Sequence, residues 1–189
     1  MTDKQVVFAG GVVLPAIGQG TWYMGENAGH RRAEVSALRA GVDLGLTLID
    51  TAEMYADGGA EEVVGEALNG LREHVFLVSK VYPWNAGGQK AIAACEASLR
   101  RLKTDYLDLY LLHWSGNFSF AETVKAMETL MAQGKIRRWG VSNLDVDDMQ
   151  ALWQIPGGRQ CATNQVLYHL ASRGIEYDLL PWCLSLIHI

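Results

Sequence analysis

VFLVSKVYPWNAGGQKAIAACEASLRRLKTDYLDLYLLH, residues 75–113, is the stretch of sequence that decides the fold. It begins with an apolar run at Val75–Lys80, continues with an amphipathic segment at Gln89–Leu102 and ends with a strongly apolar run at Asp105–His113. Short apolar runs bounded by turn residues are typical of buried strands, and longer segments with apolar residues at helical spacing are typical of covering helices. The stretch therefore predicts a strand–helix–strand unit of a parallel sheet.

The same alternation extends in both directions along the chain. Before it, Gln5–Leu14 predicts a β-hairpin, because Gly10 and Gly11 interrupt two apolar runs. One of the expected helices begins with Glu61 and Glu62, acidic residues that favour a helix N-terminus. The further expected helices cover 31–44, 60–68, 121–132 and 146–153, and the further expected strands cover 16–22, 46–50, 136–142 and 162–166.

Strands that alternate with helices in this way place the chain in the α/β class. The pattern predicts a parallel sheet with about six βα units after the N-terminal hairpin, which as a (β/α)8 TIM barrel would be incomplete here. A complete barrel of this kind typically takes about 250 residues, and this chain has 189. We therefore expect the chain to end after its sixth strand and the helix that follows.

The composition excludes several classes of protein. With 49% hydrophobic and 20% charged residues, the chain can bury enough apolar surface to fold. A net charge of −5 without blocks of Lys and Arg predicts no nucleic-acid partner. Cys95, Cys161 and Cys183 are too few and too far apart for a disulfide scaffold, and no metal-ligand spacing predicts a metal site.

The sequence also bears on cellular location and on nucleotide-binding motifs. The N-terminal apolar stretch is interrupted by glycine and proline, which does not fit a signal peptide, and no apolar run reaches the roughly 18 residues of a membrane helix. We therefore expect a cytoplasmic protein without a membrane partner; its oligomeric state stays open. The Rossmann fingerprint and the phosphate-binding loop are both missing from the sequence.

Polar side chains stand where the expected strands end. Asp50, Lys80 and His113 end three consecutive strands, and Tyr55 follows Asp50 by five positions. In a parallel barrel these strand ends share one rim, which is where barrel enzymes place their chemistry. Each residue alone has an ordinary structural explanation, as an N-cap, a solvated lysine, a loop aromatic or a hydrogen-bonded histidine. Their occurrence in consecutive units favours a catalytic site.

Together the four side chains predict an acid that protonates a carbonyl oxygen. A phenol has a pKa of about 10, and a neighbouring ammonium favours its ionised form. Lys80 is therefore expected to lower the pKa of Tyr55, the general acid, and Asp50 to hold Lys80 in place. His113 is expected to orient the carbonyl oxygen and to stabilise its developing charge.

Six motifs of this sequence resemble the aldo-keto reductase superfamily, in the right order, over about residues 7–183. They are GQGTW at 18–22, LIDTAEMY at 48–55, LVSK at 77–80, DYLDLYLLH at 105–113, GKIRRWGVSN at 134–143 and NQ at 164–165. The resemblance implies a TIM barrel and reduction of aldehydes or ketones to alcohols with NADPH as cofactor. Within the family the chain looks most like bacterial reductases of methylglyoxal and related small carbonyl compounds.

The resemblance also implies roles for individual residues. It makes Asp50, Tyr55, Lys80 and His113 catalytic. The positions that it implies for cofactor binding are Thr21, Trp22, Asp50, Ser142, Asn143 and Gln165. The positions expected to bind substrate are Trp22, Trp84, His113 and Trp114, although Trp84 and Trp114 are equally explained as packing at the barrel rim.

The chain departs from the family pattern at its C-terminal end. We expect a barrel domain at 1–183 and an atypical tail at 184–189. Family members continue through two more strands, which supply an aromatic residue that stacks on the nicotinamide and a basic loop for the adenosine 2′-phosphate. We therefore expect a truncated, inactive fragment, and the choice between NADPH and NADH and the preferred carbonyl substrate stay open.

Two other functions remain as alternatives. The first is a non-catalytic, nucleotide-binding regulatory subunit of the same fold, and the second is a barrel lyase that uses Lys80 as a Schiff-base amine. The presence of all four catalytic positions argues against the regulatory subunit, and the set Asp50, Tyr55 and His113 favours the reductase over the lyase.

Overall fold

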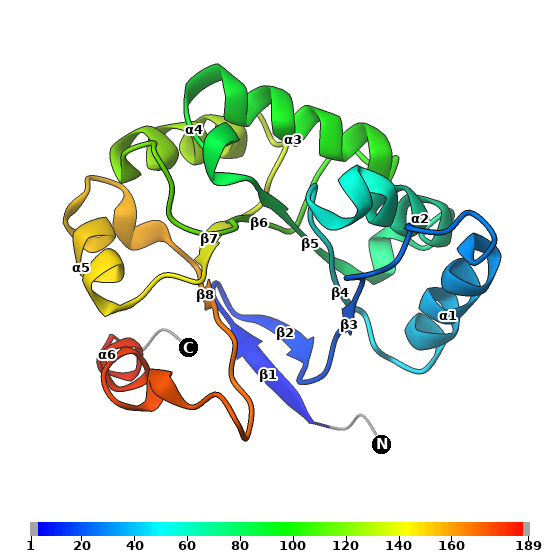
Figure 1. The fold of residues 1–189 in the computed structure, drawn as a ribbon, viewed down its shortest axis with the longest axis horizontal. Helices are drawn as coiled ribbons and strands as arrows, with labels where there is room; N and C mark the ends of the chain where they lie inside the picture. The colour runs from blue at the N-terminus through cyan, green and yellow to red at the C-terminus, as the bar shows by residue number, and fades with distance from the viewer. Residues whose placement is uncertain (1–3, 187–189) are drawn as a thin grey trace.

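The computed structural model describes residues 4–186, in which six parallel strands curl around one side of a barrel axis. Figure 1 shows the helices on the outer side of this arc. The order of the strands in the sheet follows the chain, from β3 to β8. The strands are β3 (Gln19–Gly20), β4 (Leu48–Asp50), β5 (Phe76–Val81), β6 (Leu109–Leu112), β7 (Trp139–Ser142) and β8 (Asn164–Gln165). The helices are α1 (Arg31–Asp43), α2 (Gly59–Ala67), α3 (Gly88–Leu102), α4 (Phe120–Ala132), α5 (Val146–Gln154) and α6 (Leu179–Ser185).

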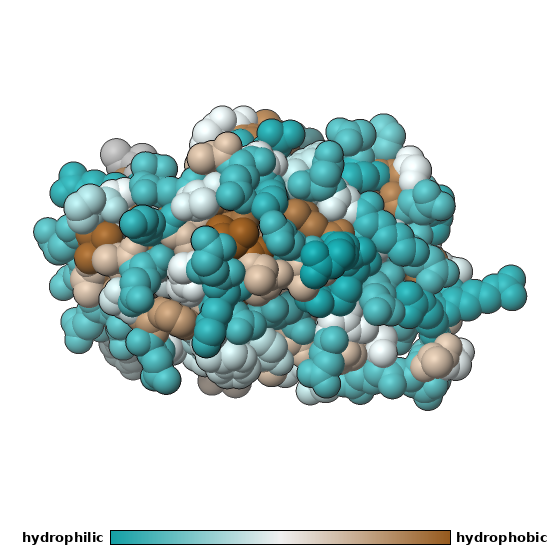
Figure 2. Space-filling model, turned by 90° about the horizontal axis from the view of Figure 1, so that it is seen from above, coloured by the Kyte–Doolittle hydropathy of each residue, from teal (hydrophilic) through white to brown (hydrophobic). Residues whose placement is uncertain are grey.

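The strand–helix alternation and the barrel class predicted from the sequence are confirmed. All residues of β5, β6 and β7 are buried, because helices cover the outer face of these strands and other residues cover the inner face. On the outer face, Leu77 and Tyr110 pack with helix residues such as Met127 in the main core. The outer surface over α3 and α4, seen from above in Figure 2, is largely hydrophilic, with apolar residues in small patches.

The predicted hairpin is also present, as β1 (Gln5–Phe8) paired antiparallel with β2 (Val12–Pro15). Gly10 and Gly11 form its turn with positive φ values, which glycine adopts without steric cost. The hairpin covers the amino-terminal end of the arc. There Phe8 meets the ring of Phe76 edge-on at 5.7 Å, and Arg138 Nε donates to Ala9 O at 3.0 Å. The hairpin does not cover the opposite, carboxyl-terminal end of the strands.

Five of the six sheet strands are shorter than the sequence predicted, and in proportion β3, β6 and β8 differ most. The expected strand at 105–113 is regular only from Leu109 to Leu112. Before it, Asp108 Oδ2 accepts hydrogen bonds from the backbone N–H of Leu77 and from Arg72, at 2.9 Å each, so side-chain bonds replace part of the ladder. The expected strands at 16–22 and 162–166 reduce to the residue pairs of β3 and β8.

The C-terminal segment folds back beside α5. Asp178 caps α6 by accepting from the N–H of Leu179, and Trp182 meets Trp153 edge-on at 5.8 Å. Of the tail expected at 184–189, Leu184 and Ser185 belong to α6, and residues 187–189 lie outside the described residues. Within residues 4–186, no helix is both long and apolar enough to cross a membrane.

Candidate active site

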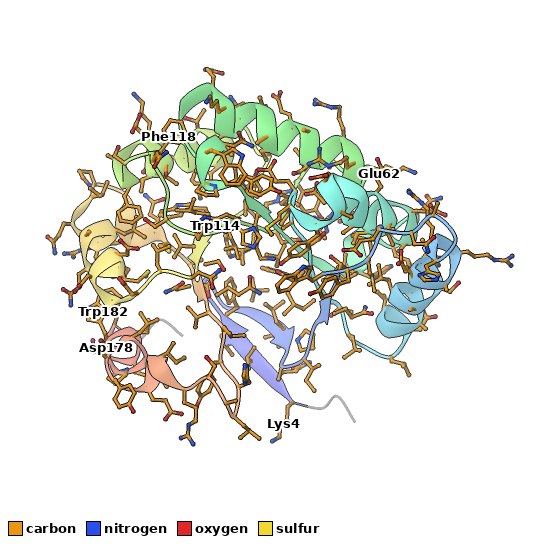
Figure 3. The ribbon with its side chains drawn as sticks, viewed as in Figure 1. Lys4, Glu62, Trp114, Phe118, Asp178 and Trp182 are labelled. Carbon is orange, nitrogen blue, oxygen red and sulfur yellow. The ribbon has the colours of Figure 1, made fainter. Side chains whose placement is uncertain are left out.

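A cavity of about 450 Å³ opens at the carboxyl-terminal ends of the strands. This volume is within the usual range for small-molecule sites, roughly 300–1,000 Å³. Figure 3 shows Trp114, one of its lining residues, on the inner side of the arc. The residues that line the cavity are Trp22, Met54, Tyr55, Lys80, His113, Trp114, Ser142, Asn143, Gln165, Val166 and Leu167.

Lys80 is the centre of the hydrogen-bond network at this cavity. Its side chain is only 2% exposed, and Nζ donates to Asp50 Oδ2 at 2.7 Å, to Thr51 O at 2.9 Å and to Tyr55 Oη at 3.1 Å. An ammonium has three N–H donors, so these three bonds use all of them. The phenol oxygen of Tyr55 therefore accepts from Lys80, and the phenolic proton is left for another acceptor.

The net shift of the Tyr55 pKa is opposite to the one that the charge of Lys80 alone predicts. Burial, and after it the charge of Asp50, raise the pKa of Tyr55 above its ordinary value of 10.0. Burial likewise lowers the pKa of Lys80, although the charge of Asp50 opposes this. Desolvation of the phenol is thus the main cause of the shift, and the neighbouring ammonium does not reverse its direction. The consequence is that Tyr55 keeps its proton at neutral pH, as a general acid must before it reacts.

The Tyr55 ring is held by aromatic neighbours on two sides. Trp22 stacks against it, with 6.0 Å between ring centroids and 9° between planes. His113 approaches edge-on at 5.8 Å. The residues after Tyr55 turn sharply, since Ala56 and Asp57 both have positive φ values, of 51° and 50°. The phenol is therefore fixed in orientation as well as in position.

His113 lies against Trp114, with ring centroids 4.8 Å apart. Burial, and after it the charge of Lys80, lower the pKa of His113 from 6.5 to about 4. The imidazole is therefore neutral at pH 7 and can donate only one hydrogen bond. Its buried Nδ1 has no hydrogen-bond partner among residues 4–186.

Three residues with amide or hydroxyl groups form the other side of the cavity. Ser142 Oγ donates to Gln165 O at 2.8 Å, and Asn143 Nδ2 donates to His113 O and to Ser142 Oγ, both at 3.1 Å. Gln165 Nε2 donates to Asp50 Oδ1 at 3.3 Å. Asp50 therefore connects both sides, with Oδ2 on Lys80 and Oδ1 on Gln165. A set of amide and hydroxyl groups at a cavity fits a ligand carboxamide, which both donates and accepts hydrogen bonds.

Thr21 and Trp84 lie outside the lining of this cavity, although the resemblance predicted them as binding residues. Thr21 is fully buried, and its Oγ1 donates to the backbone oxygen of Asp50 at 3.0 Å. Trp84 is half exposed and stacks on Tyr82 at 4.2 Å, which fits the rim-packing explanation. Their binding roles stay predictions.

The cavity also has lining residues that the sequence analysis did not name. Met54, Val166 and Leu167 contribute an apolar part of the wall. Each is close in sequence to a predicted site residue, so an inspection of the neighbours of Tyr55 and Gln165 would have found them. In the described part of the chain, no group of three or more His, Cys, Asp and Glu residues could hold a metal ion.

The site thus consists of a phenol hydrogen-bonded to a buried lysine at the carboxyl-terminal rim of a parallel α/β half-barrel. The family model described as "Aldo/keto reductase family" matches residues 16–186. The chain belongs to this family, as the resemblance implied.

Relatives of known name and structure agree with this assignment. The chain is 81% identical over 183 residues to "Methylglyoxal reductase YeaE" of Escherichia coli K12, a match that covers 97% of this chain and 64% of YeaE. An aldo/keto reductase of Klebsiella pneumoniae crystallised with NADP and acetate is 70% identical, with a TM-score of 0.95, and the match covers 97% of this chain and 65% of that one. An aldo-keto reductase of the same organism in complex with NADPH is 69% identical, also with a TM-score of 0.95, and the match covers 98% and 66% of the two chains. The chain thus spans about two thirds of the length of these relatives.

Proposed function

We propose that this cavity is the catalytic site of an NADPH-dependent reductase that converts small aldehydes and ketones, methylglyoxal among them, to alcohols. The observation that carries the proposal is the bonding of Lys80, which leaves the phenolic proton of Tyr55 free for a substrate oxygen. The name of YeaE supports methylglyoxal as substrate, and the NADP and NADPH complexes of the Klebsiella proteins support the cofactor.

The residues present fit a nicotinamide. When bound, reduced nicotinamide supplies a hydride to the carbonyl carbon. Ser142, Asn143 and Gln165 would hold its carboxamide, since they offer hydroxyl and amide groups at the cavity wall. Lys80 then has a second task, because its ammonium at 3.1 Å from Tyr55 Oη stabilises the phenolate left after proton donation.

His113 completes the polar surface for the substrate. A neutral imidazole at the cavity can donate one hydrogen bond to the carbonyl oxygen, which orients that oxygen toward Tyr55. The lining of the cavity also includes Trp22, Met54 and Leu167. This combination suits a small carbonyl compound with an apolar end.

The Schiff-base alternative is disfavoured by the same geometry. A lysine nucleophile needs an unprotonated amine with a lone pair that faces the substrate. Lys80 Nζ instead donates hydrogen bonds to Asp50, Thr51 and Tyr55, so all three of its N–H groups are used within the protein.

The test compares this chain with a hybrid in which the part of YeaE that follows the match is joined to it. We expect the hybrid to oxidise NADPH in the presence of methylglyoxal. We expect the 189-residue chain alone to show no turnover, because β3 and β8 each lack a strand neighbour on one side among the described residues. In the hybrid, Tyr55→Phe should lower kcat by at least about 10²-fold while NADPH binding is kept. A hybrid that binds NADPH without reducing small aldehydes, or a Tyr55→Phe variant with more than about a tenth of the activity, would contradict the proposal.

A further inference from the structure

Glu61 is a charged residue that the chemistry above does not use. It lies in the first turn of α2, on the outer side of the sheet, and its side chain is 0% exposed. A buried carboxylate is costly unless other groups satisfy it. Its partners therefore indicate what the protein gains from it.

The carboxylate of Glu61 joins three elements of the barrel. Ser79 of β5 donates its hydroxyl to Glu61 Oε1 at 2.6 Å, and Arg101 of α3 donates Nε to Oε2, also at 2.6 Å. Arg101 Nη2 donates further to Ser98 Oγ at 3.2 Å. Both carboxylate oxygens are thus bound, one to a strand and one to a neighbouring helix.

One of these elements carries Lys80, and another directly follows the turn that carries Tyr55. Ser79 directly precedes Lys80 on β5, and successive side chains of a strand point to opposite faces. Lys80 therefore faces the cavity while Ser79 faces Glu61. On the other side, α2 follows directly from the turn at Tyr55–Gly58. The bond from Ser79 to Glu61 thus connects the strand of Lys80 to the helix that continues the Tyr55 turn.

Arg101 also packs directly against that turn. A Cβ added to Gly58, which has a φ of +91°, would lie 2.5 Å from both Cδ and Nε of Arg101. Only glycine fits there, because the Arg101 side chain occupies the space. Ala56 and Asp57, with their positive φ values, make the turn unfavourable for an isolated chain, so packing must stabilise it.

We infer that Glu61, Arg101 and Ser79 are positioning residues that hold the Tyr55 turn against β5, so that the phenol stays within hydrogen-bond distance of Lys80. This inference rests on the proposed function for its catalytic meaning, but the support of the turn is a property of the chain alone. The three residues lie on the outer side of the sheet and are not among the residues that line the cavity.

Electrostatics add a second effect of Glu61. Its charge raises the pKa of Lys80 and so opposes the effect of burial. The other titratable groups that face Lys80 are Asp50, Tyr55 and His113. Loss of the Glu61 charge should therefore move the alkaline limb of the kcat profile, where Lys80 loses its proton, to lower pH.

The first experiment is hydrogen exchange on the 189-residue chain, which needs no activity. The turn contains amides that exchange can report, since Tyr55 N donates to Ala52 O and Asp57 N to Met54 O. We expect Ser79→Ala and Glu61→Gln to speed exchange at residues 55–58 by about 5-fold or more, relative to β6 in the same sample. Equal protection of the turn in both variants and in the parent chain overturns the inference.

Glu62→Gln is the matched control. Glu62 is adjacent to Glu61 on α2 but makes a surface ion pair with Arg31, with side chains 50% and 36% exposed, and Figure 3 shows it on the outer side of the helix. Its substitution should leave exchange at the turn unchanged. Glu61→Gln leaves Arg101 without its partner and could prevent folding for that reason alone. In that case the double variant Glu61→Gln/Arg101→Met, which has no buried unpaired charge, replaces it, and Ser79→Ala is measured separately as before.

The second experiment measures kinetics in the YeaE hybrid. We expect Glu61→Gln and Ser79→Ala to lower kcat per NADPH-binding site by about 10-fold, with KM for methylglyoxal changed by less than about 2-fold, because the acid is misplaced while the cavity remains. Only Glu61→Gln should also shift the alkaline limb. An unchanged kcat in variants whose turn exchanges faster overturns the positioning role. If the unsubstituted hybrid reduces no aldehyde, the proposed function fails, and the exchange result alone decides whether these residues support the turn.

Discussion

The two sides of the cavity are built differently. On the side of β4 and β5, side chains bond to side chains, and Lys80, Asp50 and Tyr55 fix one another at distances of 2.7 and 3.1 Å. On the side of β7 and β8, backbone oxygens take a larger part, since Ser142 donates to Gln165 O and Asn143 donates to His113 O. Lys80 is buried, whereas Asn143 and Gln165 are exposed.

This difference follows from what each side has to do under the proposed function. Proton donation depends on charge and distance, and both change when any one of the coupled side chains is removed. Recognition of a carboxamide depends on several hydrogen bonds of modest strength, each held by backbone that remains when a neighbour is replaced. Substitutions on the β4–β5 side should therefore be severe and change the pH dependence. Substitutions on the β7–β8 side should be mild and change binding.

Lys80→Met is expected to have the largest effect. It removes all three donors that fix Asp50, Thr51 and Tyr55, and it removes the charge that stabilises the phenolate. The kcat of the YeaE hybrid should fall by about 10²–10⁴-fold. The alkaline limb of the profile should move upward, because the deprotonation of Lys80 no longer occurs and loss of the ammonium raises the pKa of Tyr55 further. A pH–rate profile measures both. A profile of unchanged shape that is merely scaled down would mean that Lys80 does not tune Tyr55.

The sequence predicted the members of this cluster but not its electrostatics. Asp50, Lys80 and His113 were found because apolar runs end at them, and Tyr55 because it follows in a motif. The net direction of the Tyr55 pKa shift did not follow from the sequence, because sequence shows which charges are near but not how deeply a group is buried. The neighbouring residues Glu61 and Glu62 of α2 show the same limit. They are alike in sequence, and only the packing of α2 on α3 buries one of them.

The fold shows a corresponding division. Strands with buried faces, such as β5, were predicted because an uninterrupted apolar run indicates cover on both faces. The two-residue strands β3 and β8 were predicted too long, since their ends are set by bonds between distant residues, such as Thr21 Oγ1 to Asp50 O. Trp84 is a similar case, because the sequence left open whether it binds substrate or packs at the rim. Its stacking on Tyr82 is a contact that the spacing of residues does not predict.

His113→Gln should have a smaller effect on rate and a measurable effect on stability. Loss of one oriented donor should reduce kcat/KM by about 10-fold in the hybrid. Because burial and Lys80 lower the pKa of His113 from 6.5 to about 4, the unfolded chain binds a proton at higher pH than the folded chain does. The contribution of this residue to the free energy of unfolding is thus present above pH 6.5 and is lost as the pH falls toward 4.

Urea unfolding of the 189-residue chain at several pH values between 7 and 4 measures this dependence. The parent chain should lose more stability over this interval than His113→Gln does, since glutamine does not titrate. Parallel losses in the two chains would show that His113 is not held neutral by its surroundings.

Gln165→Ala should have the smallest effect and so gives the sharpest test of the difference between the two sides. The substitution removes the hydrogen bond from Nε2 to Asp50 Oδ1 at 3.3 Å, but Lys80 still bonds Asp50 Oδ2 at 2.7 Å. The backbone oxygen of Gln165, which accepts from Ser142 Oγ and from Asn143 N, also remains. The acid cluster should therefore keep its geometry.

We expect the Kd of the hybrid for NADPH to rise by about 5- to 10-fold, which corresponds to roughly 1 kcal/mol for one lost hydrogen bond. The kcat at saturating NADPH should stay within about 2-fold of the parent. Fluorescence titration gives the first quantity and steady-state kinetics the second. A large fall in kcat with little change in Kd would show that Gln165 acts through Asp50 on the proton donor, and that the two sides of the cavity work as one network.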